Sequence, residues 1–465
     1  MKIYLLSLFL YFIYILPVIS AKVLYKDDII RSMQNSGHTW FFDGRPFMAA
    51  IHYLINFDTK IFNLAPLNQI LGISILCYAG YLFVRKYLSD LSVCLKVLCI
   101  VSLVISPLFL ENLAFNFESL GFCISLSIPL FMCSVSDNLS NLKIAVIAAV
   151  STFSVLCIYQ ASIGAIIITS FLVLYLEPEK VKLFFTRLCG IFAGTVVYML
   201  TVSKSIATTG YQGYHSQYSF SIELILKNLN IFFKEYKNLF LSDTNSWVMF
   251  LFIVVITACM ISICYYLFEL KSQYKWVCVL PFLSVVFSVL PMCPLNHPVY
   301  LPRVFISFNI VVFFYVIILS KLCIRFSLVK YLIILITIWG FSFSAMFGNV
   351  LVAQEKYESR VLSYIAYDLG KLNLPEKVNY HLLGKPLICH EAAEAEKKYK
   401  LFRNLNNTII RNDRLYWAGG LSRYINRQIP PKKGIHLEKN NYPLLTVHDL
   451  YYILGDKENI IIHIR

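Results

Sequence analysis

Long apolar stretches, separated by short polar loops, run through most of the chain up to residue 348. A bilayer core about 30 Å thick takes roughly 20 consecutive apolar residues in a helix. We therefore expect an all-α polytopic membrane protein with about eleven transmembrane helices. The predicted spans are 3–21, 65–84, 93–110, 113–133, 144–160, 161–176, 188–203, 247–268, 276–292, 303–320 and 329–348.

After the last span, the pattern of the chain changes. The segment QEKYESRVLSYIAYDLGKL alternates apolar and charged residues at helical period, whereas GKPLICH and ENIIIHIR are typical of strands. Turns are expected at Ile429 to Pro431 and at Asn440-Asn441. These features divide the chain into a transmembrane domain, 1–348, and a small extramembrane α/β domain, 349–465.

Composition supports lipid as the solvent of the first domain. Hydrophobic residues make up 58% of the chain and charged residues 14%, against about 25% charged in a soluble protein. Alternating strands of an outer-membrane barrel are not seen. The net charge is +15, but no basic-aromatic nucleic-acid module is visible, so nucleic acid is not an expected partner.

The distribution of lysine and arginine predicts the orientation. If the N-terminus is cytoplasmic, the loops after the even-numbered spans are short and mostly basic, as the positive-inside rule requires. The basic residues of these loops are Arg85, Lys86, Lys96, Lys143, Lys180, Lys182, Arg187, Lys271, Lys275, Lys321, Arg325 and Lys330. Loop 22–64, segment 204–246 and the C-terminal domain then face the opposite side, which would be the periplasm if the source were a Gram-negative bacterium.

Segment 204–246 is expected to have two parts. TTGYQGYHSQYS is predicted to be a polar loop, and apolar residues recur at helical spacing from Phe220 to Leu241. This amphipathic helix either lies in the membrane interface or packs on the protein body.

The candidate chemistry begins in loop 22–64. Asp27 and Asp28 are adjacent, Arg31 lies one helical turn beyond Asp27, and Arg45 follows in a Gly-Arg-Pro turn. A carboxylate flanked by cations stays ionised and can act as a general base, so we take Asp27 or Asp28 as the catalytic residue. The two arginines suit a phosphate. A solvated loop that merely caps the first span is the alternative.

Further polar residues are predicted to reach the same face. Glu111 and Glu118 lie seven residues apart, a spacing that would put them on one helical face within the membrane edge. The predicted substrate-binding residues are Glu111, Asn112, Glu118, Gln160 and His297. The predicted phosphate-binding residues are Arg31, Arg45, Arg303, Lys356 and Arg360. Structural hydrogen bonds or snorkelling explain several of them as well.

Carboxylates and cations at a membrane edge suit a lipid-phosphate-linked sugar. A carboxylate would deprotonate an acceptor hydroxyl, which attacks the anomeric carbon, and the lipid phosphate would leave with inversion. No Walker A or Rossmann fingerprint is present. We expect no cofactor. A divalent cation would fit the paired carboxylates, but we expect none to be essential.

The ordered motifs resemble the bacteriophage-type O-antigen glucosyltransferases of serotype conversion, the Gtr type II family. The resemblance lies in YKDDIIRSM, W-x-x-x-GRP at Trp40 to Pro46, APLNQILGISIL, FLENLAFNFESL, YQASIGA and GNVLVAQEKYESRVLSYIAYDL. Glu118 stands where an aspartate is expected, and the tail from about 370 matches nothing in the family.

The resemblance implies a GT-C type membrane glycosyltransferase of the bacterial inner membrane, with its acidic motif at Asp27-Asp28. It implies transfer of glucose from undecaprenyl-phosphate-glucose to the O-antigen of lipopolysaccharide on the periplasmic side. A donor synthase and a donor flippase would be functional partners. A flippase of lipid-linked sugars is the alternative from another class, and a polysaccharide polymerase or ligase is a third hypothesis.

Overall fold

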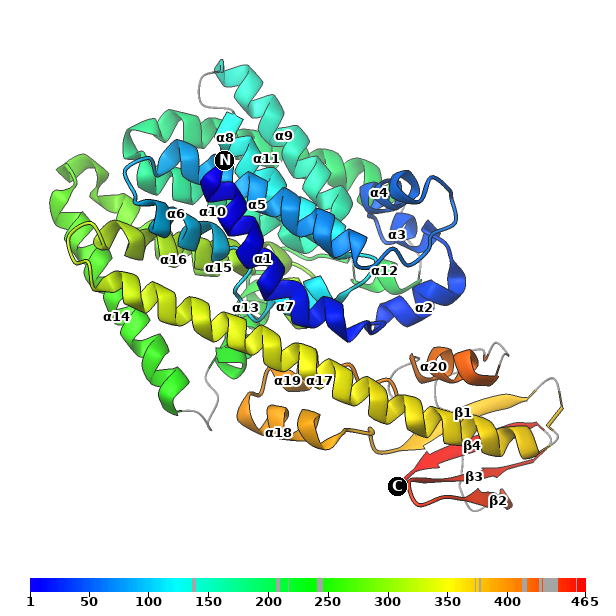
Figure 1. The fold of residues 1–465 in the computed structure, drawn as a ribbon. Coiled ribbons are helices and arrows are strands. Elements are labelled where there is room, and N and C mark those ends of the chain that lie inside the picture. Colours follow the sequence, from blue (N-terminus) through cyan, green and yellow to red (C-terminus); the bar gives the residue numbers. More distant parts are fainter. Residues whose placement is uncertain are drawn as a thin grey trace. The chain divides into compact units, whose positions relative to one another are not determined.

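The computed structural model describes residues 1–135, 139–205, 210–215, 217–240, 246–372, 374–375, 378–411, 416–425, 429, 442–456 and 458–465. The chain divides into two compact units. The first, here the helical unit, comprises Met1–Ile19 and Ser36–Met346. The second, the sheet unit, comprises Ser20–Asn35 and Phe347–Arg465 and holds the labelled strands (Figure 1).

The helical unit is built from long helices joined by short turns. Its helices are α1 (Lys2–Ala21, whose last two residues belong to the sheet unit), α3 (His38–Phe42), α4 (Pro46–Asn56), α5 (Leu67–Tyr87), α6 (Val93–Val101), α7 (Phe109–Ala114), α8 (Ser119–Val135), α9 (Asn141–Ile158), α10 (Ile163–Leu176), α11 (Val181–Tyr198), α12 (Gly210–His215), α13 (Ile222–Phe240), α14 (Ser246–Glu269), α15 (Leu280–Phe287), α16 (Phe308–Leu322) and the first part of α17 (Val329–Lys371). Short 3-10 or π turns are η2 (Gln160–Ser162), η3 (Pro178–Lys180), η4 (Met199–Ser203), η5 (Ser272–Val279), η6 (Leu290–Met292) and η7 (Pro302–Ser307).

Seven helical segments of the described chain are long and apolar enough to cross a membrane. They are Lys2–Ala21, Leu67–Tyr87, Asn141–Ile158, Pro178–Ser203, Val248–Glu269, Pro302–Leu322 and Val329–Lys371. Three shorter apolar helical segments are Ser119–Val135, Gln160–Leu176 and Ser272–Phe287. The membrane class is supported, whereas the count of eleven spans stays a prediction.

The region between residues 93 and 118 differs from the expectation. The predicted span 93–110 is not one helix: α6 ends at Val101, before Pro107, which cannot continue a helix because it lacks an N–H and clashes with the preceding turn. Glu111 lies within α7, and Glu118 precedes α8. Phe115 between them is extended, so the two glutamates do not share one helical face as predicted.

Helices α9 and α11 pack at very short distance because α11 carries a Gly-x-x-x-Gly pair. A Cβ added at Gly190 would stand 2.3 Å from the carbonyl oxygen of Ala145, and one at Gly194 equally close to that of Ala149. Small residues at one helix face let two backbones approach in this way. This contact fixes the end of α11 that carries Tyr198.

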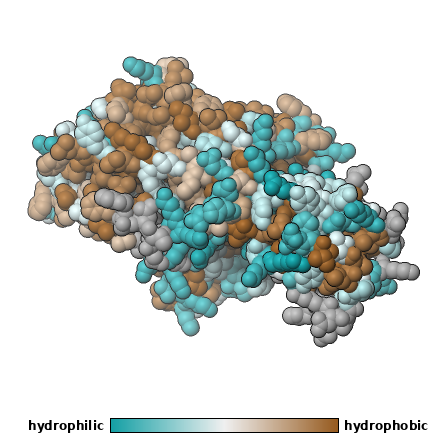
Figure 2. All heavy atoms as spheres, turned by 60° about the horizontal axis from the view of Figure 1, so that its bottom comes forward, coloured by the Kyte–Doolittle hydropathy of each residue, from teal (hydrophilic) through white to brown (hydrophobic). Residues whose placement is uncertain are grey.

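Apolar side chains cover broad areas of the surface (Figure 2). On α9, Leu142, Val146 and Val150 point outward, and α14 exposes Phe250 and Ile256. Exposed apolar faces of this extent on long helices indicate contact with lipid rather than water.

Helix α13 confirms the amphipathic helix predicted from Phe220 to Leu241. One face packs on the protein body: Phe232 is buried against Phe305, and Asn228 Nδ2 donates to the carbonyl oxygen of Cys293 at 2.8 Å. Packing on the body is therefore the better of the two interpretations. The preceding stretch, predicted to be loop, contains the short helix α12.

The sheet unit is an α/β arrangement. Its elements are α2 (Asp27–Gln34), the last part of α17, β1 (Asn379–Gly384), α18 (His390–Lys398), α19 (Phe402–Leu405), α20 (Tyr416–Ile425), β2 (Leu444–Val447), β3 (Tyr451–Gly455) and β4 (Asn459–Ile464). The strand order is β1-β4-β3-β2. Among the described strands, β1 and β4 pair in parallel, and β3 is antiparallel to both β4 and β2.

One apolar core holds the sheet unit together. Val361 and Ile365 of α17 and Trp417 of α20 cluster with Ile453 and Ile462 of the sheet. The strand predicted at ENIIIHIR is confirmed as β4. GKPLICH is not a strand. Strand β1 ends at Gly384, the first residue of this segment, which has a φ of 101° that L side chains rarely adopt. The predicted turns at Pro430-Pro431 and Asn440-Asn441 lie outside the described residues.

Candidate functional site

The site begins at the turn between α3 and α4. Gly44 has a φ of 70°, which favours glycine, and Pro46 opens α4 at a position where its missing N–H costs nothing. The Arg45 amide donates to the carbonyl oxygen of Trp40 at 2.8 Å, and the Asp43 amide to that of Thr39 at 2.9 Å. The W-x-x-x-GRP motif thus encodes a tight turn that places Asp43 and Arg45.

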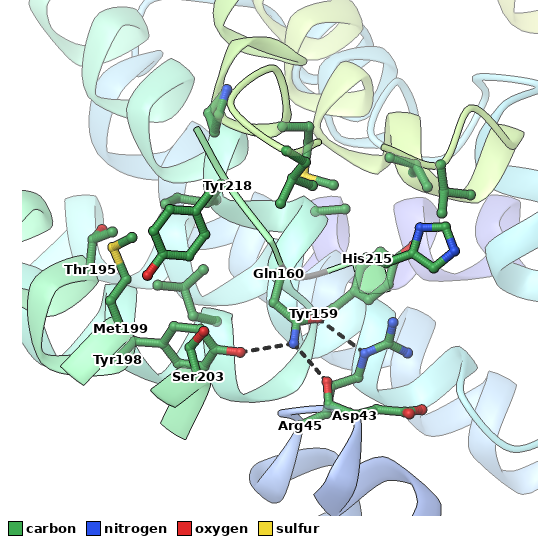
Figure 3. Close-up of a pocket in the computed structure, with 18 of the residues that line it drawn as sticks. Asp43, Arg45, Tyr159, Gln160, Thr195, Tyr198, Met199, Ser203, His215 and Tyr218 are labelled. Atoms are coloured by element: carbon green, nitrogen blue, oxygen red, sulfur yellow. Dashed lines mark hydrogen bonds between the residues drawn. The ribbon is translucent and has the colours of Figure 1, made fainter. Parts of the chain in front are cut away.

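Gln160 ties this turn to the break between α9 and α10. Its Nε2 lies 3.1 Å from the carbonyl oxygen of Asp43, 3.2 Å from that of Gly44 and 2.9 Å from the Tyr198 hydroxyl. Its Oε1 accepts from Arg45 Nε at 3.1 Å. The Tyr198 hydroxyl also donates to the Gly44 carbonyl at 2.9 Å. Both the oxygen and the nitrogen of the Gln160 side-chain amide therefore hold the turn (Figure 3).

Arg303 is fixed through its backbone. Its amide donates to Glu111 Oε2 at 2.7 Å, and its carbonyl oxygen accepts from Asn112 Nδ2 and from the Tyr159 hydroxyl, each at 3.2 Å. Its guanidinium lies over the ring of Phe115, 5.4 Å from the centroid. Glu111 and Asn112 thus position an arginine.

Tyr159 contributes to the placement of both arginines. Its ring lies beneath the Arg45 guanidinium, which is 4.9 Å from the centroid, while its hydroxyl holds the Arg303 backbone. Stacking on a ring orients a guanidinium, and an oriented guanidinium can bind an anion through its N–H groups.

These residues surround a cavity of about 240 Å³ (Figure 3). The predicted residues that line it are Arg45, Gln160, His297 and Arg303. Asp43, Tyr159, Tyr198, His215 and Tyr218 join them, and the remaining walls are mostly apolar. The cavity therefore combines two fixed cations with hydrogen-bonding groups inside an apolar frame, the usual make-up of a small-ligand site.

His215 and His297 form one side of the cavity. The His215 Nδ1 donates to the His297 carbonyl oxygen at 2.6 Å, and Tyr214 stacks on the His297 ring with centroids 3.9 Å apart. The donor role of Nδ1 leaves Nε2 as the acceptor of a neutral His215 ring.

Glu118 does not line the cavity. Its Oε1 accepts the Trp40 indole N–H at 2.5 Å, and His52 stacks on Trp40 with centroids 4.3 Å apart. Glu118 therefore makes a buried contact with Trp40 of α3, and the substrate-binding role predicted for it stays a prediction.

The other predicted residues belong to the sheet unit. Asp27 and Arg31 lie on α2, and the Tyr416 hydroxyl donates to Asp27 Oδ1 at 2.6 Å. Asp28 is buried, and its Oδ2 accepts the Tyr25 amide at 3.2 Å. Lys356 and Arg360 lie exposed, one turn apart on α17.

Sequence reasoning missed several residues at the cavity. Asp43 belongs to the W-x-x-x-GRP motif, so that motif contained a signal for it. Tyr159 belongs to YQASIGA in the same way. No sequence signal marked Tyr198 and Tyr218, because a tyrosine in or near an apolar stretch usually lies in the protein core or at the membrane interface.

The family model for glucosyl transferase GtrII matches residues 16–320. The chain belongs to the GtrII glucosyl transferase family. The match includes Asp27 and Asp28 and every residue that lines the cavity. It ends before Lys356 and Arg360. A member of this family is a glycosyltransferase, and its helices indicate a membrane protein.

One curated relative is an uncharacterised 55.3 kDa protein from the gtrB 5' region of Salmonella phage P22. It is 26% identical over 424 residues, which cover 86% of this chain and 85% of the relative. No solved structure matches the chain.

Proposed function

We propose that this GtrII family member transfers glucose from undecaprenyl-phosphate-glucose to an O-antigen sugar of lipopolysaccharide, on the periplasmic side of the inner membrane. The observation that carries the proposal is the pair of guanidiniums, Arg45 and Arg303, at one cavity of the helical unit. Two cations with fixed backbones suit a phosphate that gains charge as the sugar leaves. The apolar walls suit the start of a lipid tail.

In the proposed reaction, a carboxylate of the Asp27-Asp28 pair takes the proton from an acceptor hydroxyl. The hydroxyl oxygen bonds to the anomeric carbon, and the bond from that carbon to the phosphate oxygen breaks. The lipid phosphate leaves with the bonding electrons, with inversion at the anomeric carbon. Asp27 is the better base, since it is only half-buried and the Tyr416 hydroxyl orients it. Asp28, in contrast, is buried, and its carboxylate accepts a hydrogen bond from the Tyr25 amide.

Further roles follow from the position of each residue. Arg45 and Arg303 bind the phosphate, and Gln160, His297, Glu111 and Asn112 shape the cavity around the donor. Arg31, Lys356 and Arg360 provide positive charge in the sheet unit. We propose that no cofactor or essential divalent cation is needed, since guanidiniums can carry the charge of the leaving phosphate. Among the described residues, no cluster of three or more His, Cys, Asp or Glu forms a metal site.

The test is linkage analysis of lipopolysaccharide from cells that have the donor synthase and flippase, with and without this chain. The chain should add one glucose at one position, and Arg45→Met and Arg303→Met should each abolish the addition. Arg325→Met is the matched control, because Arg325 lies in an exposed ion pair with Glu269, outside the cavity. Unchanged lipopolysaccharide with wild-type protein in the membrane would refute the proposal.

The alternatives give different products. A flippase would move the donor without forming a glycosidic bond, so purified protein with donor and acceptor in detergent would yield nothing. A polymerase or ligase would add a chain of sugars rather than a single residue. A single transferred glucose in detergent, released with one lipid phosphate per sugar, favours the transferase over both.

A further inference from the structure

The outer face of α17 in the sheet unit carries cations and tyrosines. Its inner face holds Val361 and Ile365, which belong to the apolar core of that unit (Figure 1). Between residues 349 and 371, three of the exposed side chains are cationic, two are tyrosines and none is acidic. The exposed residues of this segment are Asn349, Lys356, Arg360, Ser363, Tyr364, Tyr367, Gly370 and Lys371.

Helical geometry places five of these side chains on one stripe. They are spaced by three or four residues, so they lie along one side of the helix within about 80° of each other. With a rise of about 1.5 Å per residue, the stripe is roughly 22 Å long, which is enough for several sugar rings. The cation-tyrosine stripe, as we name it, comprises Lys356, Arg360, Tyr364, Tyr367 and Lys371.

Nearby carboxylates do not neutralise the stripe. Glu358 is buried, and its Oε1 accepts two backbone amides. Asp368 Oδ2 accepts from the Tyr451 hydroxyl at 2.7 Å. Glu355 projects from another side of the helix, about 100° from the start of the stripe. Even with the exposed Asp449 of the β2–β3 turn included, the three cations leave this surface positive.

The two tyrosine rings are exposed, yet each has a neighbour that supports it. Tyr367 is 66% exposed, and Lys371 Nζ lies over its ring, 4.1 Å from the centroid. Tyr364 is 44% exposed, and its ring centroid lies 5.2 Å from that of His448, which in turn stacks on Tyr451. Tyrosines offer a large contact area at a low cost in conformational entropy, so these rings suit a ligand surface.

The stripe extends further from the predicted last span, 329–348, than lipid headgroups reach. Those headgroups add only about 5–8 Å to each side of the hydrocarbon core. Lys356 follows the span by eight residues, or about 12 Å of helix, and Tyr364 and Tyr367 lie two to three turns beyond it. Contact with the membrane surface therefore accounts poorly for the tyrosines.

We propose that the cation-tyrosine stripe binds the acceptor, the sugar chain of an anionic glycolipid. Sugar rings pack on Tyr364 and Tyr367, and phosphate groups nearer the lipid meet Lys356 and Arg360. The inference rests on the proposed function, in which lipopolysaccharide is the acceptor. Cations close to the span and rings further away match the order of phosphates and sugars in such a molecule. The stripe also lies outside residues 16–320, the part matched by the family model.

The experiment measures initial rates of purified full-length protein in nanodiscs of neutral lipid, with donor and acceptor varied in turn. Replacing both tyrosines, Tyr364→Ala with Tyr367→Ala, should raise the acceptor KM about 10-fold, because two ring contacts are lost. The donor KM and kcat should stay constant. Phenylalanine at both positions keeps the rings and should restore most of the acceptor affinity. Lys356→Gln with Arg360→Gln should raise the acceptor KM and weaken its dependence on salt.

Arg423→Gln with Tyr424→Ala is the matched control. These two residues are an exposed cation and an exposed tyrosine of the same unit, but they lie on α20 and outside the stripe. The acceptor KM should not change in this variant. Thermal unfolding of all variants checks folding.

A binding measurement without donor gives a second readout. The probe is acceptor polysaccharide released from its lipid, so membrane insertion of the probe plays no part. Wild type and the α20 control should retain it, and the double tyrosine-to-alanine variant should lose about 10-fold in affinity.

Three results would overturn the inference. One is an unchanged acceptor KM in both stripe variants. Another is a raised donor KM, which would assign the stripe to the donor. The third is a loss that occurs only in nanodiscs of anionic phosphatidylglycerol, which would assign it to the membrane surface. A wild-type protein that transfers no glucose contradicts the proposed function instead, and polysaccharide binding separates the two failures.

Discussion

Trp40 and Glu118 are joined by a hydrogen bond of 2.5 Å between the indole Nε1 and the carboxylate Oε1, with both side chains buried. The carbonyl oxygen of the same tryptophan accepts the Arg45 amide. Glu118 therefore affects the cavity through Trp40, which anchors the turn that carries Arg45. We therefore expect Glu118, predicted from its sequence position to bind substrate, to act as a positioning residue.

The first prediction separates positioning from substrate binding at Glu118. Glu118→Gln keeps an oxygen that accepts the indole N–H and should retain most of the transfer rate. Glu118→Ala leaves a buried donor unsatisfied, which costs about 1–3 kcal/mol, so transfer should fall roughly 10-fold or more. Initial rates in detergent measure both. If both variants lose the same transfer activity, mainly through a raised donor KM, Glu118 contacts the substrate directly.

Motif reasoning found much of the cavity but explained it incompletely. The sequence predicts Gln160, His297 and Arg303 as polar residues near the membrane edge and Arg45 as a cation of loop 22–64. The structure brings all four to one cavity. The glutamate roles could not be predicted, because they depend on the break at Phe115 that separates α7 from α8. An apolar segment with one extended residue has nearly the same hydropathy as a continuous helix.

The second prediction concerns Tyr416, which no motif indicated. Its hydroxyl binds Asp27 Oδ1 at 2.6 Å, so Tyr416→Phe should misplace the proposed base and lower kcat about 10-fold while the donor KM stays constant. Tyr424→Phe, at an exposed tyrosine of the same helix, should change nothing. Single-turnover rates give the comparison. Adding Tyr416→Phe to Asp27→Asn should cause no further loss if the two act as a unit, and an additive loss would argue against the link.

The third prediction is a pH dependence of stability in the sheet unit. Glu358 lies beyond the apolar part of α17, and its burial raises its pKa to about 8, although the Ile410 and Ile409 amides, at 2.6 and 2.8 Å from Oε1, act in the opposite direction. The folded state thus keeps a proton that the unfolded chain releases near its ordinary pKa of 4.5. Stability is therefore full below that value, falls as pH rises toward 8, and is constant above.

Thermal unfolding in detergent at several pH values tests this dependence. Glu358→Gln retains an acceptor for both amides and cannot ionise, so the difference between variant and wild type should grow in favour of the variant between about pH 5 and 8. Parallel curves for the two proteins across that range would show that Glu358 does not titrate with folding.

The sheet unit shows where sequence patterns succeed and fail. The apolar run in ENIIIHIR predicted β4 correctly, since consecutive isoleucines favour a strand that is buried on both faces. The packing of α2 against α20 could not be predicted from the sequence, because the contact joins residues nearly 400 positions apart. A Cβ added at Gly419 would stand 2.8 Å from Ile29, so that contact requires a glycine that looks ordinary in the sequence.

The last prediction tests the close packing of α9 and α11. Gly194→Ala adds one methyl group 2.3 Å from the carbonyl oxygen of Ala149, and a backbone atom cannot move aside as a side chain does. The helices must separate, at a cost of about 1–3 kcal/mol, and Tyr198 on the same helix would shift from Gln160. We expect a lower unfolding temperature together with weaker transfer. Gly370→Ala is the matched control, because nothing lies within 4 Å of the added Cβ, and alanine is the better helix former. Equal unfolding temperatures for Gly194→Ala and wild type would mean that the two helices are not in close contact.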